Sequence, residues 1–580
     1  MGNSLNKYNR PFRQQVSPNA QDSFDGHLES SNVFSSLRPD ICVVGAGPVG
    51  LTLAVALARR GTKVVVFESG LNRPDSSHKS CSDAVIENPT THAEMRLAVA
   101  RAFGGTSWLW GGRCVPLDPI DFEPRPHVDP AGWPISHRDL HNYYDEAADL
   151  IGCERACFDL PVPPEFRPAA GEIDLCLEHW CPEPNVGRRL SRRGLPRNLQ
   201  IMLNATVVDL EITSNGDSVA ALHVVTSGTD RIRFNSARAY VLACGGLETT
   251  RLLLHAQEHN RNLFGGVGGP LGRFYTGHMT GSVARIRFKK PELGRAFDYI
   301  LAKGRICRRR IVFAHDILQV HQLPNVAFYP VNPLLGNPEH GAGLLSSLFL
   351  LLSAPIIGQR LISEAVRQQQ LVEKPRYLAH FRNVLSDLPA TIAQLAGIVW
   401  QRLALGHRKP YLFLQSSNGE YPLDYHGEAA PSADSRVVLD HQRDAMGMRR
   451  LRIDLRFSPN DAEAIARSHG VLDSALRRAG LAELVLNTPP DVLADAIMRY
   501  TSDGFHQIGL TRMARDPADG VVDPDCKVFD LENLFIASSS VFRTAGQANP
   551  TFSAVALGLR LADHLVSVIT CNRIPERVTG

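Results

Sequence analysis

One short segment near the N-terminus constrains the fold of this chain more than any other part of the sequence. An apolar run over 40–44 leads directly into Gly45-Ala-Gly47-Pro48-Val49-Gly50. Residues 51–60 then have helical spacing, and the apolar run 62–67 ends at the acid Glu68. A strand, a glycine turn, a helix and a second strand ending in an acid predict a Rossmann-like βαβ unit that binds a dinucleotide.

The three glycines and the acid have separate roles in such a unit. Gly45 permits the tight turn, Gly47 lets the backbone approach the pyrophosphate, and Gly50 lets the helix pack close. The N-terminus of the helix offers free N–H groups and a positive dipole to the phosphates. Glu68 is placed to accept hydrogen bonds from ribose hydroxyls. The fingerprint by itself leaves NAD and FAD both open as ligands.

Composition and charge exclude several other classes of protein. With 580 residues, the chain is long enough for two domains. Hydrophobic residues make up 44% and charged residues 21%, as in ordinary soluble globular proteins. The net charge of +3 is too small for the basic surface of a typical nucleic-acid-binding protein. No nucleic-acid partner is therefore expected.

The first 37 residues are polar and rich in Asn, Ser and Gln, so we expect a flexible N-terminal arm over 1–37. This arm has no apolar core of the kind that a signal peptide needs. Eleven cysteines without a C-x-x-C pair indicate free thiols in a reducing compartment. We therefore expect a cytoplasmic protein, with membrane association as an open alternative.

Two pairs of cysteines lie close together in the sequence, Cys153 with Cys157 and Cys176 with Cys181. Each pair could form a local disulfide or contribute to a metal site. No histidine has zinc-ligand spacing relative to them, so no metal is expected.

Three glycine-rich regions each combine an apolar strand, a turn and a helix. We expect 38–135, 195–285 and 504–570 to assemble into one discontinuous dinucleotide-binding domain around a parallel sheet. Alternating strand-like runs within 286–503 predict a sheet with one covered face. Together with 136–194, this region is expected to form a substrate-binding domain. The predicted fold class is α/β, a Rossmann-like domain plus an α+β domain with a mainly antiparallel sheet.

The substrate-binding region contains an apolar helical insertion at 340–405. Its two most apolar segments, 344–357 and 388–400, are shorter than the ~20 residues that a membrane-spanning helix needs. We expect both to be buried helices. The alternative is peripheral membrane contact through 344–400, which nearby basic residues favour. These residues are Arg360, Arg367, Lys374, Arg376 and Arg382.

Further motifs follow the glycine fingerprint in a fixed order. They are Gly104-Gly105-Thr-Ser107, Asn204-Ala-Thr-Val207, His506-Gln-Ile-Gly509-Leu-Thr-Arg-Met513, Asn533-Leu-Phe-Ile-Ala-Ser-Ser-Ser540 and Gly546-Gln-Ala-Asn549-Pro550-Thr551. In order and spacing, the chain resembles the glucose-methanol-choline (GMC) oxidoreductases, in the bacterial branch similar to pyranose 2-oxidase and FAD-dependent glucoside dehydrogenases. The resemblance covers chiefly the three glycine-rich regions and is thin across the middle of the chain.

This resemblance implies FAD as the cofactor, so the discontinuous domain becomes an FAD-binding domain. The residues that it places at the cofactor are Gly45, Gly47, Pro48, Val49, Gly50, Glu68, Ser69, Gly104, Gly105, Ser107, Trp110, Gly111, Val207, Ser540, Asn549, Pro550 and Thr551. Some relatives bond the flavin covalently through a histidine just after the Gly-Gly-x-Ser motif. The matching residue here is Leu109, so FAD is expected to be bound non-covalently.

The resemblance also implies the catalytic pair. His506 matches the base that removes the hydroxyl proton, and Asn549 matches the partner that holds the same oxygen. We interpret His278 as a packing or hydrogen-bonding residue between the domains. Phe505 and Leu510 depart from the residues that many bacterial relatives have at these positions.

The implied reaction is oxidation of a CH–OH group to a carbonyl by hydride transfer to the flavin. A sugar, glycoside or related polyol is the favoured substrate, because the Asn549 pairing resembles the sugar-oxidising branches. The apolar insertion prompts the alternative of a lipophilic alcohol, such as a sterol or polyketide. A flavoprotein lyase of the same family, or a binding subunit without redox turnover, is a further alternative. Dioxygen, a quinone and a cytochrome all stay open as the electron acceptor.

Overall fold

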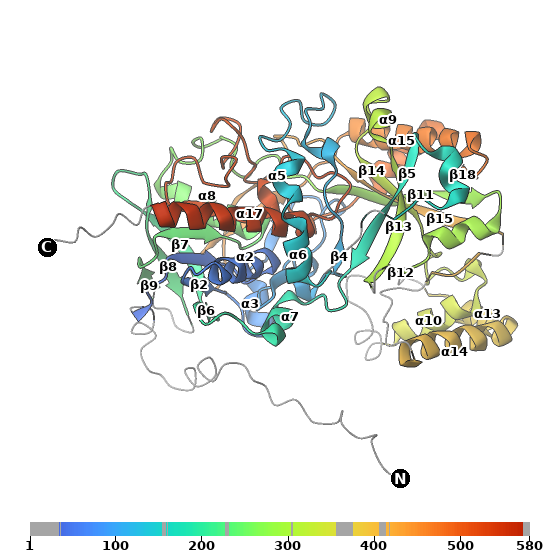
Figure 1. The fold of residues 1–580 in the computed structure, drawn as a ribbon, viewed down its shortest axis with the longest axis horizontal. Coiled ribbons are helices and arrows are strands. Elements are labelled where there is room, and N and C mark those ends of the chain that lie inside the picture. The colour runs from blue at the N-terminus through green and yellow to red at the C-terminus, as the bar shows by residue number, and fades with distance from the viewer. Residues whose placement is uncertain are drawn as a thin grey trace, which may run out of the picture.

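The computed structural model describes residues 34, 36–153, 158, 160–226, 231–302, 305–354, 375–404, 413–416 and 418–571. Nearly all of the expected N-terminal arm lies outside these residues. The described residues form two parts that lie side by side along the long axis of the molecule (Figure 1). One part is built on a parallel sheet and the other on a larger antiparallel sheet.

The first part is a five-stranded parallel sheet in the order β19-β10-β1-β2-β6. Its strands are Ile41–Val44 (β1), Val64–Phe67 (β2), Leu199–Met202 (β6), Ala239–Leu242 (β10) and Leu534–Ile536 (β19). Strands β1, β2, β10 and β19 are short apolar runs that are almost entirely buried, as expected where both faces of a parallel sheet are covered, whereas the edge strand β6 is only partly buried. Three regions that are distant in sequence therefore form one sheet, which confirms the discontinuous Rossmann-like domain.

Helices and a small second sheet cover this parallel sheet. Helix α2 (Pro48–Arg59) packs against α17 (Pro550–Cys571), and α8 (Gly246–His259) follows β10. A three-stranded antiparallel sheet of Thr206–Ile212 (β7), Val219–Val225 (β8) and Arg231–Phe234 (β9) packs through the rings of Phe234 and Phe67, whose centroids are 4.9 Å apart.

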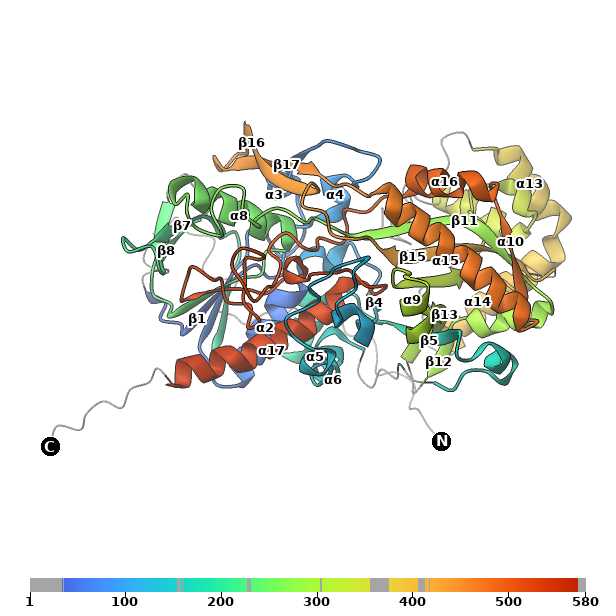
Figure 2. The same cartoon turned by 90° about the horizontal axis from the view of Figure 1, so that it is seen from above.

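Within the described residues, one helix is long and apolar enough to cross a membrane, the segment Pro550–Thr570 of α17. Its most apolar window is 67% buried inside the protein. The helix packs beside α2 (Figure 2), and its buried share is that of a helix that packs on the core of a protein.

The second part is an antiparallel sheet of eight strands, in the order β18-β11-β15-β14-β13-β5-β4, with β12 paired to β13. Its strands are Arg113–Cys114 (β4), Ile173–Trp180 (β5), His278–Phe288 (β11), Ile300–Ala302 (β12), Arg305–Phe313 (β13), Val326–Pro330 (β14), Glu420–Glu428 (β15) and Ala482–Leu486 (β18). Helix α15 (Pro459–Arg478) crosses the sheet and α16 (Leu493–Tyr500) packs on β11 (Figure 2). This arrangement confirms the predicted α+β domain with a mainly antiparallel sheet.

The boundaries between the two parts differ from the expected ones. Three helices of the segment 136–194 pack on α2 or α17: α5 (His137–His141), α6 (Tyr144–Ile151) and α7 (Val186–Arg193). Within this segment, the strand that enters the antiparallel sheet is β5. The strand that begins at His278 also belongs to that sheet, although we expected the first part to extend to residue 285. Helical spacing shows that a face is apolar but does not show which partner covers it, which explains these differences.

A second difference concerns the hairpin of Arg436–Arg443 (β16) and Arg449–Asp454 (β17). We expected it in the substrate-binding domain, but it pairs with Ala84–Ile86 (β3) and packs against α8. The remaining short helices are Ser76–Ser80 (α3), Met95–Ala98 (α4) and His315–Val320 (α9).

The apolar insertion forms the helices Gly343–Ser353 (α10), Tyr377–Ser386 (α13) and Leu388–Ala404 (α14). As expected, α10 is largely buried, and it packs on both other helices. The expectation for 388–400 was wrong, because residues 388–397 of α14 are exposed apart from Thr391. Residues 355–357 and the basic residues at 360, 367 and 374 lie outside the described residues.

A buried ion pair joins the two parts of the molecule. The two terminal nitrogens of the Arg125 guanidinium, Nη1 and Nη2, donate to the carboxylate of Glu428 at the end of β15. The Nη2–Oε2 distance is 3.0 Å. The same carboxylate accepts the backbone N–H groups of Asn325 at 2.7 Å and Gly546 at 3.2 Å. Glu428 therefore ties the antiparallel sheet to the loop that leads into α17.

Replacing Arg125 by Met should destabilise the protein by about 3–5 kcal/mol, because it leaves the Glu428 carboxylate buried without a counter-ion. Urea unfolding followed by circular dichroism measures the effect. The control is Arg456→Met, which removes an exposed ion pair with Asp454 and should change stability little. Equal unfolding midpoints for the two variants would show that the Arg125 ion pair does not stabilise the fold.

Candidate active site

A cleft opens at the carboxyl ends of β1, β2 and β10. Ligands of open α/β sheets bind in the crevice at this edge of the sheet. The cleft is lined by backbone and side chains from 44–49, 67–69, 98–101, 205–207, 243–248, 537–539 and 550–554. At its far end it reaches Phe505 and Gln507, the neighbours of the predicted base.

The geometry of the turn accounts for each of its three glycines. Gly45 has φ +105°, and a Cβ there would lie 2.6 Å from the carbonyl oxygen of Ala243. A Cβ on Gly50 would lie 2.1 Å from the carbonyl oxygen of Gly45, so the helix and the turn approach as the fingerprint requires. Nothing lies within 4 Å of a Cβ on Gly47, which borders the cleft. The space for a pyrophosphate is therefore beside Gly47.

The second glycine motif packs directly on the first. Gly105 has φ +52°, and a Cβ there would lie 2.6 Å from the Cα of Gly47. The 3₁₀ turn Gly105–Trp108 therefore closes over the glycine turn and forms one wall of the cleft.

Glu68 lies at the end of β2 and is buried. Its two oxygens accept the backbone N–H groups of Ala46 and Gly70, each at 2.8 Å. Burial raises the pKa of the Glu68 carboxyl, and these two N–H donors act against that rise. Each oxygen keeps a further lone pair, so a ribose hydroxyl in the cleft can donate to this carboxylate.

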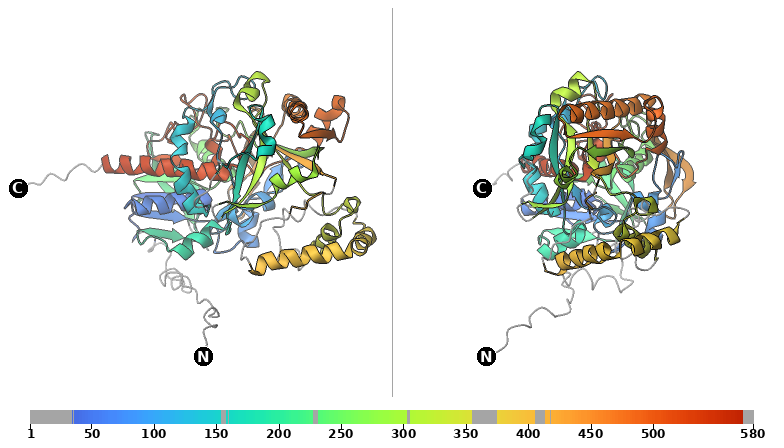
Figure 3. Two further views of the ribbon diagram at one scale, coloured as in Figure 1. Left: turned by 45° about the vertical axis from the view of Figure 1, so that its right-hand side comes forward. Right: turned by 90° about the vertical axis from the view of Figure 1, so that its right-hand side faces the viewer.

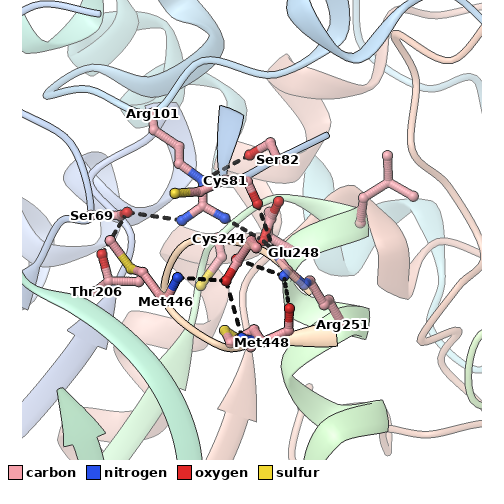
Figure 4. Close-up of polar contacts among 12 residues, drawn as sticks. Ser69, Cys81, Ser82, Arg101, Thr206, Cys244, Glu248, Arg251, Met446 and Met448 are labelled. Atoms are coloured by element: carbon pink, nitrogen blue, oxygen red, sulfur yellow. Dashed lines mark hydrogen bonds and ion pairs between the residues drawn. The ribbon is translucent and has the colours of Figure 1, made fainter. Parts of the chain in front are cut away.

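Arg101 braces the same wall of the cleft (Figure 4). Its guanidinium donates to Ser69 Oγ at 2.8 Å, Ser82 Oγ at 2.7 Å and Glu248 Oε2 at 2.6 Å. Burial acts to raise the pKa of Glu248, but the charges of Arg101 and Arg251 outweigh it and hold the pKa below its ordinary value. The ion pair with Glu248 holds the Arg101 guanidinium, which in turn fixes Ser69 by a hydrogen bond. This ion pair was not expected from the sequence.

Ten of the predicted cofactor residues line the cleft: Gly45, Gly47, Pro48, Val49, Glu68, Ser69, Gly105, Val207, Pro550 and Thr551. The cradle at Gly47 and the acceptor at Glu68 fit the pyrophosphate and ribose of FAD. Seven predicted residues are not among those that line the cleft: Gly50, Gly104, Ser107, Trp110, Gly111, Ser540 and Asn549. Ser107 donates to the Gly104 carbonyl, Trp110 to the Pro184 carbonyl at 2.8 Å, and Ser540 bonds Thr511 at 2.7 Å.

His506 lies beside the cleft with 18% of its side chain exposed. Its Nε2 is 3.1 Å from the amide nitrogen of Asn549, and its Nδ1 is 3.0 Å from Oδ2 of Asp503. The structure therefore brings together the two predicted catalytic residues, which are 43 positions apart.

The carboxylate of Asp503 determines the tautomer of His506. Burial acts to raise the pKa of Asp503, but the charge of His506 and hydrogen bonds from His278 and His506 hold it well below its ordinary value. An ionised carboxylate only accepts hydrogen bonds, so the proton of His506 lies on Nδ1. Nε2 then carries the lone pair, which accepts the N–H of Asn549. A substrate hydroxyl that displaces this N–H can give its proton to Nε2.

Two further histidines surround His506. Nδ1 of His278 is 2.9 Å from Nδ1 of His506, and the ring of His426 stacks on His278 with centroids 4.1 Å apart. Burial lowers the pKa of both His278 and His426, so both are neutral at pH 7. Because both rings are neutral, neither places a positive charge beside His506, and the Asp503 carboxylate is the charged group that its Nδ1 contacts.

Asp503 and His426 were not expected from the sequence, whereas the expected hydrogen-bonding role of His278 is confirmed. A signal for Asp503 was present, because an aspartate three residues before a histidine often accepts local backbone N–H groups. Here its Oδ1 accepts the N–H groups of Phe505 at 2.9 Å and His506 at 3.2 Å. His278 and His426 come from β11 and β15, and only the pairing of these strands brings them to His506.

Comparison with known proteins agrees with this geometry. Residues 431–558 match the family model described as GMC oxidoreductase, and 40–269 match that of FAD dependent oxidoreductase. The 2-methyl-1,2-propanediol dehydrogenase of Mycolicibacterium austroafricanum is 22% identical over 609 residues, covering 92% of this chain and 96% of the relative. The C-glycoside 3-oxidase of Arthrobacter globiformis is 29% identical over 153 residues, or 25% of this chain and 27% of the relative.

The fold agrees with solved structures as well. The crystal structure of pyridoxine 4-oxidase from Mesorbium loti superposes with a TM-score of 0.50 at 17% identity, covering 91% of this chain and 99% of that structure. The chain therefore combines an FAD dependent oxidoreductase domain at 40–269 with a GMC oxidoreductase domain at 431–558. It is an FAD-dependent enzyme that oxidises a CH–OH group.

Replacing Asp503 by Asn should slow substrate oxidation by between about 10-fold and 10⁴-fold, because an amide no longer fixes the His506 tautomer. It should also lower stability at pH 7 by about 1.5–3 kcal/mol. The folded-state pKa of Asp503 is depressed, so its contribution is present above the unfolded pKa and is lost as pH falls. The stability difference should therefore shrink below pH ~4.

Stopped-flow flavin reduction and urea unfolding at a series of pH values measure these effects. The control is Asp491→Asn, which changes an exposed aspartate far from the histidines in sequence and should match the wild type. A stability difference for Asp503→Asn that grows toward acid pH would contradict the ionised state of Asp503.

Proposed function

We propose that this enzyme oxidises a hydroxyl group of a sugar, glycoside or related polyol to a carbonyl. The observation that carries the proposal is the His506–Asn549 pair beside the cleft, with Asp503 bonded to the opposite nitrogen of His506. Such an arrangement supplies a proton acceptor, an N–H donor for the substrate oxygen and a negative charge to balance the protonated base.

Each residue has a defined part in this chemistry. Bound FAD would accept the hydride from the carbinol carbon. Nε2 of His506 takes the hydroxyl proton, and the amide N–H of Asn549 holds the same oxygen as negative charge develops on it. The carboxylate of Asp503 then stabilises the imidazolium that forms.

Polar atoms around the base support a substrate with several hydroxyl groups. Within the described residues, four buried atoms of this cluster have no hydrogen-bond partner: His278 Nε2, His426 Nε2, Gln547 Oε1 and Asn549 Oδ1. Buried polar atoms normally have partners, and a hydroxyl-rich ligand supplies both donors and acceptors. The relatives named C-glycoside 3-oxidase, fructose dehydrogenase large subunit and pyranose 2-oxidase point in the same direction.

Anaerobic flavin bleaching with a panel of sugars, glycosides, diols and sterols tests the proposal. Polyols should reduce the flavin, and His506→Ala should slow this reduction by ~10²–10⁴-fold at matched FAD content. The control is His441→Ala, since the His441 side chain is 82% exposed. Reduction by sterols alone would favour the lipophilic alcohol, and near wild-type reduction in His506→Ala would remove His506 as the base.

FAD content in that experiment is measured by denaturation and filtration, which also tests non-covalent binding. FAD should pass the filter, because Leu109 offers no nucleophile to the flavin. Yellow colour retained with the denatured protein would contradict this. Dioxygen, a quinone and a cytochrome added in turn to the reduced enzyme then identify the acceptor.

We also propose that the enzyme is cytoplasmic and contacts a membrane through α13 and α14, which lie along one edge of the molecule (Figure 3). Their exposed side chains include Leu378 at 84% and Leu385 at 71%, with Phe381 and Ile392 beside them in sequence. A single acid, Asp387, occurs between 376 and 404, whereas Arg376, Arg382 and Arg402 are basic. A helix surface of this composition suits the interface of an anionic bilayer.

Co-sedimentation with vesicles of an anionic phospholipid measures this contact. The protein should pellet with the vesicles, and replacing Leu378, Phe381 and Leu385 by Ser should release it because each removes exposed apolar area. The control is Val320→Ser on α9, which removes a similarly exposed apolar residue elsewhere. Wild-type protein that stays in the supernatant would rule the contact out.

A further inference from the structure

Three buried cysteines meet at one point away from the catalytic pair. Cys114 belongs to β4, Cys153 follows α6, and Cys181 follows β5. The Sγ atom of Cys181 is 3.2 Å from that of Cys153 and 3.6 Å from that of Cys114. All three sulfur atoms lie within 4.8 Å of one another, and no residue of the three is more than 4% exposed.

These partners differ from the pairs that the sequence suggested. Cys181 lies next to Cys153 and Cys114 rather than Cys176, and Cys176 is a free thiol elsewhere on β5. Cys157 lies outside the described residues. The expectation that these cysteines form no metal site rested on sequence spacing alone, and the three sulfurs come together only through the fold.

The backbone around the cluster is built for close approach. The N–H of Cys181 donates to the carbonyl of Gly112 at 2.8 Å. Gly112 has φ +74°, and a Cβ there would lie 3.2 Å from the Cβ of Cys181. Gly112 follows Trp110 in the loop after the second glycine motif, so the cluster joins this loop to α6 and to β5.

Basic side chains lie near the cluster. The charge of Arg189 acts on Cys181, and the charge of Arg305 acts on Cys153. These two cations would partly offset the negative charge of three thiolates in the interior.

The spacing of the sulfurs matches a shared ion better than a disulfide. Three sulfurs bound tetrahedrally at ~2.3 Å from one ion lie ~3.8 Å apart. The Sγ atom of Cys181 is 3.6 Å from that of Cys114 and 3.2 Å from that of Cys153, so a small shift of side chains would give this spacing. A disulfide would join two of the sulfurs and leave the third without a role. Three soft thiolates in a dry site select zinc or copper(I) over harder cations.

We propose that Cys114, Cys153 and Cys181 bind one thiophilic metal ion, zinc or copper(I), through three thiolates. The thiols lose their protons when the ion binds, and the ion joins the loop after the second glycine motif to α6 and to the antiparallel sheet. The site is structural and takes no part in the hydride transfer.

Elemental analysis of the FAD-loaded, full-length enzyme tests this site, both as purified and after anaerobic incubation with Zn²⁺ or Cu⁺ and a thiol-free reductant. We expect one ion per chain. The incubation, with Zn²⁺ or with Cu⁺, in which the enzyme takes up the ion identifies the metal. Cys153→Ser and Cys114→Ser should lose the ion, since removing a ligand costs more than the ~10–100-fold in affinity that removing an outer partner costs. The control is Cys176→Ser on β5, the strand that Cys181 follows, and this variant should keep the ion.

A second measurement avoids dependence on variants that fold poorly. Wild-type enzyme loaded with Co²⁺ should show a thiolate-to-cobalt charge-transfer band, and the flavin content should not change. Four outcomes would overturn the proposal: wild type that binds no ion in either incubation, Cys153→Ser that binds as wild type does, a disulfide among the three cysteines by mass spectrometry, or iron with acid-labile sulfide.

Discussion

The parallel pairing of β1, β10 and β19 is the constraint on which the rest of the site depends. Ile41 pairs with Ala239 and Val44 with Leu242, and β10 in turn pairs with Leu534–Ile536. The ladder continues past the strands, because Ala243 donates to Val44 and Ala537 donates to Leu242. Parallel strands share the edge at which their carboxyl ends meet, so the glycine turn and the C-terminal segment border the same cleft.

The C-terminal segment then brings the proposed catalytic pair to that cleft. The chain reaches His506 before β19 and Asn549 after it, and the pairing of β19 brings both to the cleft. Asp503 is buried at this point, and burying its charge is offset by N–H groups from His278, Phe505 and His506 and by the His506 ring. A carboxylate held in this way fixes one tautomer of the base and stabilises the charge that proton transfer creates.

The antiparallel sheet contributes to the site through two histidines and an ion pair. His278 and His426 come from adjacent strands, and the Glu428 carboxylate at the end of β15 accepts the backbone N–H of Gly546 while it also pairs with Arg125. Gly546 lies three residues before Asn549. The sheet therefore helps to position one member of the proposed catalytic pair, and its histidines surround the other.

The sequence by itself determined the βαβ unit, the assembly of one domain from three regions, and the pair His506 and Asn549. These features are encoded locally, in glycines that only a tight turn explains and in short motifs whose order can be read along the chain. The tertiary structure alone decided the partners of these residues. Arg101 with Glu248, His278 with His506, the packing of α6 on α17, and the three converging cysteines all join segments far apart in sequence. Residue spacing does not determine such contacts, because they depend on which strands pair and which helix faces pack together.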